Sequence, residues 1–131
     1  MIDRSAEDNP EKSRIYNALL VTFVWVLVCW IMYLTDDFLG IGLKKYGLEP
    51  RALDGLIGII SMPFLHSSWE HLIQNTLAIL VLNTFLFYFY RPLSFRVFII
   101  AFFITPIMLW MVGRNGNHIG ASALLYFEFG F

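Results

Sequence analysis

The stretch "IYNALLVTFVWVLVCWIMYLT", residues 15–35, contains no charged side chain. An α-helix rises 1.5 Å per residue, so a run of this length would reach about 30 Å, the thickness of the hydrocarbon core of a bilayer. The tail before the run is not basic, the run is longer than the core of a signal peptide, and Asp36 and Asp37 follow it in place of a small-residue cleavage site. We therefore predict an uncleaved first membrane span.

The composition of the chain supports the same class of protein. Of the 131 residues, 58% are hydrophobic and 15% are charged, whereas soluble domains average about 45–50% and about 25%. The charges gather near the N-terminus and between residues 36 and 54, with long apolar runs elsewhere. The net charge of −1 gives no indication of a nucleic-acid partner. This pattern is typical of an integral membrane protein in contact with the lipid bilayer.

Two further apolar runs predict a second and a third span, at about residues 69–90 and 97–112. The basic stretch "YRPLSFR", residues 90–96, is expected to connect them. The following "GRNGNHIG", residues 113–120, predicts a turn because of its glycine and asparagine content, and a fourth helix is expected to start near residue 120. The predicted fold is an all-α polytopic transmembrane bundle with three full spans and the start of a fourth.

The predicted domain organisation is a polar tail at residues 1–14 and one transmembrane domain at residues 15–131. The loop between the first two spans, residues 36–65, ends in the apolar patch "LIGIISMPFL", and we expect part of it to enter the membrane interface. Basic residues indicate the orientation. With the N-terminus in the cytoplasm, the inside segments hold Arg4, Lys12, Arg14, Arg91 and Arg96, and the outside segments hold Lys44, Lys45, Arg51 and Arg114. This balance favours a multi-pass protein of the cell (inner) membrane with a cytoplasmic N-terminus.

The second predicted span carries polar side chains, which cost free energy in a membrane and are candidates for function. His71 and Asn75 are four residues apart and share one helix face. Gln74 lies beside that face, and Asn83 lies two turns below Asn75. These groups either form hydrogen bonds that hold neighbouring helices together or line a functional site.

Ser122, at the start of the fourth helix, has two interpretations. Its hydroxyl can cap backbone N–H groups, or it can be a nucleophile, since a helix N-terminus also suits an oxyanion. The soluble nucleophile elbow Gly-x-Ser-x-Gly is excluded because position 124 is Leu and no strand precedes the serine.

Histidines elsewhere in the chain do not predict a metal site. His66, Glu70 and His71 are close in sequence but do not form the pattern His-Glu-x-x-His, and the two histidines fall on different faces of a continuous helix. His118 lies in the predicted turn and is expected to be a solvated loop residue. We predict neither a metal nor a cofactor.

Together these segments resemble the rhomboid family of intramembrane serine proteases. The stretch "GLEPRALDGLIGIISMPFLHSSWEHLIQN", residues 47–75, is similar to the first extramembrane loop of the family running into the second span. Within it "HLIQN" resembles the family's His-x-x-x-Asn, and "FLH" resembles the histidine that precedes that motif. "GASALLY", residues 120–126, resembles the Gly-x-Ser-Gly motif with a tyrosine one helical turn later. The resemblance covers roughly Leu43 to Tyr126.

The resemblance implies an endopeptidase that cleaves transmembrane protein substrates within or near the bilayer. Ser122 would be the nucleophile, and His71 and Asn75 would donate hydrogen bonds to the oxyanion together with the backbone N–H of Ser122.

Three further roles follow from the same resemblance. Tyr126 would pack against the catalytic histidine and line the substrate cleft. Gly120 would let the backbone approach closely near the oxyanion hole. His66 would play a structural hydrogen-bonding role in the loop.

Two departures from the family pattern open an alternative. Ala123 stands where the family has glycine after the serine. Family members activate the serine with a histidine about two helices downstream, whereas only nine residues follow Ser122 here. Neither His71 nor His118 is a favoured substitute for that base. We therefore expect no proteolysis by these 131 residues alone, and the chain resembles either the N-terminal portion of an active protease or a pseudoprotease that binds membrane clients without cleavage. A small membrane scaffold with chance motif matches is the third interpretation.

Overall fold

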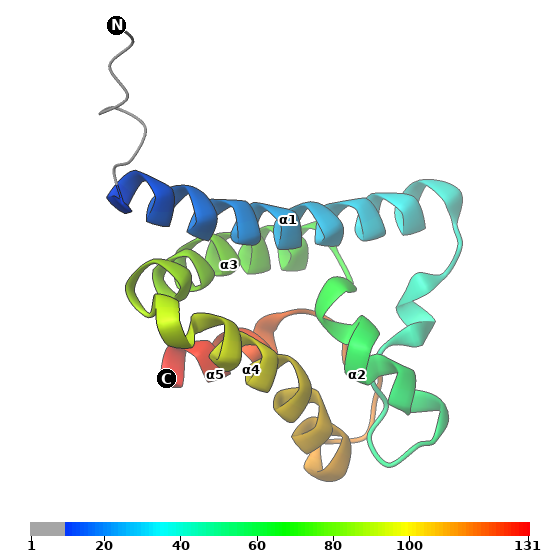
Figure 1. Ribbon diagram of the computed structural model, residues 1–131. Helices are drawn as coiled ribbons and strands as arrows, with labels where there is room; N and C mark the ends of the chain where they lie inside the picture. Colours follow the sequence, from blue (N-terminus) through cyan, green and yellow to red (C-terminus); the bar gives the residue numbers. More distant parts are fainter. Residues whose placement is uncertain (1–9) are drawn as a thin grey trace, which may run out of the picture.

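The computed structural model describes residues 10–131, and within them all regular elements are helical (Figure 1). The long helices are α1 (Pro10–Leu39), α3 (Trp69–Phe89) and α4 (Arg91–Val112), and α5 (Ser122–Gly130) is short. Four short elements connect α1 to α3: η2 (Leu43–Tyr46), η3 (Asp54–Ile57), α2 (Gly58–Ser61) and η4 (Met62–Phe64). The prediction of an all-α bundle is confirmed.

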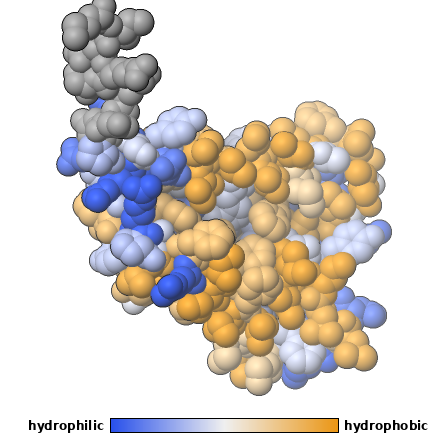
Figure 2. All heavy atoms as spheres, viewed as in Figure 1, coloured by the Kyte–Doolittle hydropathy of each residue, from blue (hydrophilic) through white to orange (hydrophobic). Residues whose placement is uncertain are grey.

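Helices α1, α3 and α4 are each long and apolar enough to cross a membrane. Apolar side chains cover most of the face seen in Figure 2. Large apolar side chains of all three long helices are more than half exposed, among them Phe23, Val81 and Phe95. A water-soluble fold would bury such side chains, whereas lipid solvates them. The chain is therefore a membrane protein.

Helices α1 and α4 extend beyond the spans that hydropathy predicts, whereas α3 matches its predicted span. Helix α1 begins at Pro10, so residues 10–14 of the predicted polar tail are helical, and residues 1–9 lie outside the described part of the chain. Helix α4 begins at Arg91 instead of near residue 97, which corrects the predicted connection of residues 90–96 to the single residue Tyr90. A proline in the first turn of α4 explains the early start, because the fixed φ of proline suits the first turn of a helix and its missing N–H is not needed there.

The bundle is built on the packing of α1 against α3 (Figure 1). The buried positions of α1 recur at intervals of three and four residues, which places them on one face: Ala18, Thr22, Trp25, Cys29, Tyr33 and Asp36. The buried positions of α3 show the same spacing: Leu72, Asn75, Ile79, Asn83 and Leu86. Helix α5 adds Leu124 and Leu125 to the common core, alongside α3 and α4.

Hydroxyl and indole groups join α1 to α3 at two levels. Thr84 Oγ1 donates a hydrogen bond to Thr22 Oγ1 at 3.2 Å, and Thr22 Oγ1 donates to the Ala18 carbonyl of its own helix at 2.8 Å. One level away, Trp30 Nε1 donates to Thr76 Oγ1 at 3.0 Å. The α3 side chains that form these hydrogen bonds to α1 are therefore Thr76 and Thr84. They are different from His71 and Asn75, which the sequence singles out.

The region between α1 and α3 forms short helical turns with apolar side chains on the outside. Leu53 is 80% exposed and Ile60 is 61% exposed. Such residues are suited to the membrane interface, which keeps the prediction for this loop open to test.

The pair Thr22 and Thr84 allows a test of the α1–α3 contact. Thr22→Val and Thr84→Val should each weaken the fold, and in a double-mutant cycle the two changes should couple by about 0.6 kcal/mol, the average for hydrogen bonds between membrane helices. The measurement is reversible unfolding in mixed micelles. Thr22→Ser and Thr84→Ser, which keep the hydroxyl, are the matched controls, and strictly additive valine variants would contradict the contact.

Candidate active site

The segment that leads into α5 is held by the loop that follows α1. Leu48 and His118 pair as an isolated antiparallel bridge: Leu48 N–H donates to the His118 carbonyl at 2.8 Å, and His118 N–H donates to the Leu48 carbonyl at 2.7 Å. Two residues further on, Gly120 N–H donates to the Met62 carbonyl at 2.9 Å. These bonds fix the backbone immediately before Ser122 although that backbone is not helical.

Arg51, in the same loop, contacts the other end of this connecting segment, where α4 ends. Its backbone has a φ of 61°, which is uncommon for a residue with a side chain, and its N–H donates to the Trp110 carbonyl at 3.0 Å. Its guanidinium donates to the Gly113 carbonyl at 2.9 Å and also to the Asn115 side chain. Arg51 thus supplies donors to the last carbonyls of α4, which have no partner within the helix.

Gly120 lies directly against the His71 ring. Its φ is 112°, a conformation that residues with a side chain rarely adopt. A Cβ atom at this position would lie 2.6 Å from His71 Nε2 and 3.5 Å from Asn75 Nδ2. The two side-chain nitrogens therefore converge on one place, two residues before Ser122, and only a glycine leaves that place open.

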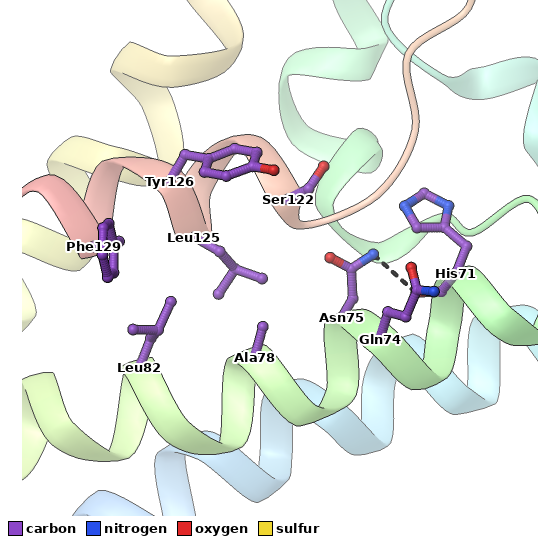
Figure 3. A pocket seen from close by; sticks show the side chains of 9 residues that line it. All are labelled: His71, Gln74, Asn75, Ala78, Leu82, Ser122, Leu125, Tyr126 and Phe129. Carbon is purple, nitrogen blue, oxygen red and sulfur yellow. Dashed lines mark hydrogen bonds between the residues drawn. The ribbon is translucent and has the colours of Figure 1, made fainter.

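Ser122 is the first residue of α5, and Ala121 occupies the N-cap position. Within residues 10–131 the Ser122 hydroxyl makes no hydrogen bond, and no side chain caps α5. The capping interpretation of Ser122 is therefore not realised in this structure. Ser122 lines a cavity of about 480 Å³ (Figure 3).

The cavity lies between α3 and α5 and changes character along its length (Figure 3). Its polar end contains His71, Gln74, Asn75 and Ser122, and its other end contains Ala78, Leu82, Leu125 and Phe129. Tyr126, also in the lining, is 78% exposed and lies one turn below Ser122. The size is in the range of small-ligand sites, and the combination of apolar walls with a few polar groups is typical of them.

The polar residues predicted in α3 separate into two environments. Asn75 is 4% exposed, and its Nδ2 donates to the His71 carbonyl at 3.0 Å, which leaves the second N–H of the amide free for another acceptor. His71 is half-buried and Gln74 is exposed at the cavity. Asn83 is fully buried, and within the described residues its amide has no hydrogen-bond partner. The structure brings His71, Asn75 and Ser122 together, but Asn83 does not line the cavity.

His66, for which the resemblance implies a structural hydrogen-bonding role, is buried beside the His71 ring. It is 1% exposed, and within residues 10–131 neither ring nitrogen has a hydrogen-bond partner. The ring instead packs edge-on against the His71 ring, with 5.2 Å between the centroids. Burial, and to a smaller extent the neighbouring His71, lower the pKa of His66 to about 4. The structural hydrogen-bonding role of His66 stays a prediction, and in the fold His66 is a neutral, buried packing partner of His71.

Three features in and around the site were not apparent from the sequence. Ser67 Oγ lies 3.0 Å from His71 Nδ1. Glu128 on α5 is 8% exposed, and both carboxylate oxygens lack a partner among the described residues. The backbone of His118 pairs with Leu48, although the sequence predicts only a solvated turn. The four-residue spacing of Ser67 and His71 was the one available signal, whereas the other two features depend on which segments meet in the fold.

The fold and the cavity define a helical membrane protein with a serine, a histidine and an asparagine at one polar recess. No family model and no solved structure matches the chain. It is 32% identical over 113 residues to uncharacterized proteins of Mycobacterium tuberculosis and Mycobacterium bovis, a match that covers 82% of this chain and 46% of each relative. An uncharacterized protein of Mycobacterium leprae is 27% identical over the same length. The chain spans about half the length of these curated relatives.

The contact between Gly120 and His71 predicts the effect of adding one methyl group. Gly120→Ala should destabilise the protein by about 1–3 kcal/mol through backbone strain and should also displace the His71 ring. Gly116→Ala is the matched control, because Gly116 has a φ of 132° but would place its Cβ in open space. Unfolding in micelles and the NMR signals of the His71 ring measure the two effects. Equal ring signals in both variants would exclude the close approach.

The lowered pKa of His66 predicts a pH dependence of stability. A histidine buried in its neutral form favours folding above its unfolded pKa of about 6.5. That contribution should be lost as the pH falls from about 6.5 toward 4, by at most about 1.4 kcal/mol per pH unit. His66→Phe retains an aromatic ring against His71 and should remove this part of the pH dependence. Unfolding measured across this pH range is the test, and an unchanged slope in the variant would contradict it.

Proposed function

We propose that this chain carries the nucleophile and the oxyanion-binding groups of a rhomboid-type intramembrane serine protease. The observation that supports the proposal most directly is that His71 Nε2 and Asn75 Nδ2 both lie beside Gly120, and that His71 and Asn75 line the same cavity as Ser122. The motif resemblance predicted these residues individually, and their proximity in the fold supports the proposal.

In this proposal the Ser122 hydroxyl attacks the carbonyl carbon of a peptide bond. The carbonyl oxygen becomes an oxyanion in the tetrahedral intermediate. Three donors are suited to it: one His71 ring N–H, the second Asn75 N–H and the backbone N–H of Ser122, which lies in the first turn of α5 and has no partner within the helix. Donors that are already in position stabilise the developing charge without further reorganisation.

The nucleophile requires a general base within hydrogen-bond reach. Among residues 10–131 no histidine makes a hydrogen bond with Ser122. The family resemblance implies a base on a later span, and the longer relatives have room for such a span. Tyr126, exposed one turn below Ser122, would contact that histidine.

The cavity indicates the kind of substrate. Its polar end would hold the reacting peptide bond, and its apolar end, between α3 and α5, would accommodate a hydrophobic side chain or helix. A transmembrane protein that is cleaved near the membrane surface has both characters. We place the protein in the cell membrane, with its N-terminus in the cytoplasm, as part of this proposal.

A rhomboid-like pseudoprotease is the second candidate function. Two features favour it: Ala123 stands in place of the family's glycine, and among residues 10–131 no histidine makes a hydrogen bond with Ser122. Such a protein would bind membrane clients in the same cavity without cleaving them. The two functions differ in whether Ser122 is reactive.

A fluorophosphonate probe tests the proposed protease. In the gene's full-length product the probe should label Ser122, and Ser122→Ala should abolish labelling. His71→Ala and Asn75→Ala should each slow labelling by about 10²–10³-fold, the usual effect of losing one oxyanion donor. Ser94→Ala, a buried serine of α4 outside the cavity, is the control. Equal labelling of wild type and Ser122→Ala would sink the protease assignment and leave client binding.

A further inference from the structure

Two consecutive serines contact the same histidine at the start of α3. Ser68 is the N-cap residue, and its hydroxyl accepts a hydrogen bond from the His71 backbone N–H at 3.2 Å. Ser67 contacts the ring instead, with its Oγ 3.0 Å from Nδ1. The backbone of Ser67 is held in turn by Lys44, whose Nζ donates to the Ser67 carbonyl at 3.1 Å. Lys44 therefore holds the Ser67 backbone in place, and the Ser67 hydroxyl contacts Nδ1, the ring nitrogen of His71 that does not lie beside Gly120.

The direction of the Ser67–His71 hydrogen bond determines what His71 can do chemically. A neutral imidazole carries one N–H, and the hydrogen bond at one nitrogen selects which nitrogen holds it. If the Ser67 hydroxyl donates to Nδ1, the proton is on Nε2, and His71 presents a donor next to Gly120. If Ser67 accepts from Nδ1–H, Nε2 is an acceptor, and His71 would be suited to serve as a base.

The proposed oxyanion site requires the first arrangement, because only a protonated Nε2 can donate a hydrogen bond to an oxyanion beside Gly120. Asn75 Nδ2, which can only donate, converges with Nε2 on the same place beside Gly120. Two N–H groups that converge on one point form a site for an oxygen with negative charge. Ser67, at the exposed side of the ring, is able to donate because the proton of a hydroxyl rotates toward an available acceptor.

We propose that Ser67 is a positioning residue that donates its hydroxyl proton to His71 Nδ1 and so holds the ring in the Nε2–H tautomer. His71 is then an oxyanion donor and not a general base. The consequence for catalysis rests on the proposed protease function, whereas the tautomer itself is a property of this chain. No residue in the motif resemblance has this role.

The tautomer is measured by ¹⁵N NMR of histidine-labelled protein, with these 131 residues in detergent micelles at a pH above 7. In the wild type His71 should show a protonated Nε2 and an unprotonated Nδ1. Ser67→Ala should shift the tautomer ratio about fivefold toward Nδ1–H, the effect of losing one hydrogen bond, and Ser67→Thr should restore it. Ser68→Ala, which removes the cap but not the ring contact, should leave the ratio unchanged. A protonated Nδ1 in the wild type, or an unchanged ratio in Ser67→Ala, overturns the inference.

Labelling of Ser122 in the gene's full-length product gives the second readout. Ser67→Ala should slow fluorophosphonate labelling about fivefold, and Ser67→Thr should recover the wild-type rate. Absence of Ser122 labelling in the wild type would reject the protease, while the NMR result would still decide the role of Ser67. Normal labelling together with an unchanged tautomer in Ser67→Ala would reject the role of Ser67 and leave the protease in place.

Discussion

The backbone of a membrane protein must find its hydrogen-bond partners within the protein, because lipid supplies none. The three long helices satisfy this condition internally. Residues 113–121 do not, since they connect α4 to α5 without a helix. Their partners come from the loop after α1, through the Leu48–His118 bridge, the bond from Gly120 to Met62 and the guanidinium of Arg51. This pairing places Gly120 against His71, so the candidate site depends on the backbone hydrogen bonds between the two loops.

Polar side chains in the bundle divide according to the helix face that they occupy. On the α1 side of α3, threonines pair with Thr22 and Trp30 and hold the two helices together. On the α5 side, His71 and Asn75 line a cavity with Ser122. The same helix thus carries a packing face and a site face. Polar groups in a membrane protein cost free energy, and on the first face hydrogen bonds across helices offset that cost. On the second face the polar groups form a recess that can receive a polar group of a ligand.

The histidine pair at the start of α3 shows how the fold controls the chemistry of one side chain. His66 is buried, and its lowered pKa keeps it uncharged beside His71. Ser67 contacts His71 Nδ1, Gly120 leaves room next to Nε2, and Asn75 donates to the His71 backbone. A neutral ring with one nitrogen engaged and the other directed at the cavity is the arrangement that an oxyanion donor requires. The loop, the helix N-terminus and the α5 entry segment each contribute one part of it.

The amino-acid sequence by itself determined the class of protein, the three apolar helices and the start of α5, because hydropathy and helical periodicity are local properties of the chain. It also identified His71, Asn75 and Ser122, because their spacings and motifs can be recognised without a structure. The tertiary structure alone decided that the Ser122 hydroxyl makes no hydrogen bond within residues 10–131, that Gly120 lies against the His71 ring and that His66 is buried beside the same ring. These facts depend on contacts between residues as far apart as Leu48 and His118, and no local pattern encodes which loops meet.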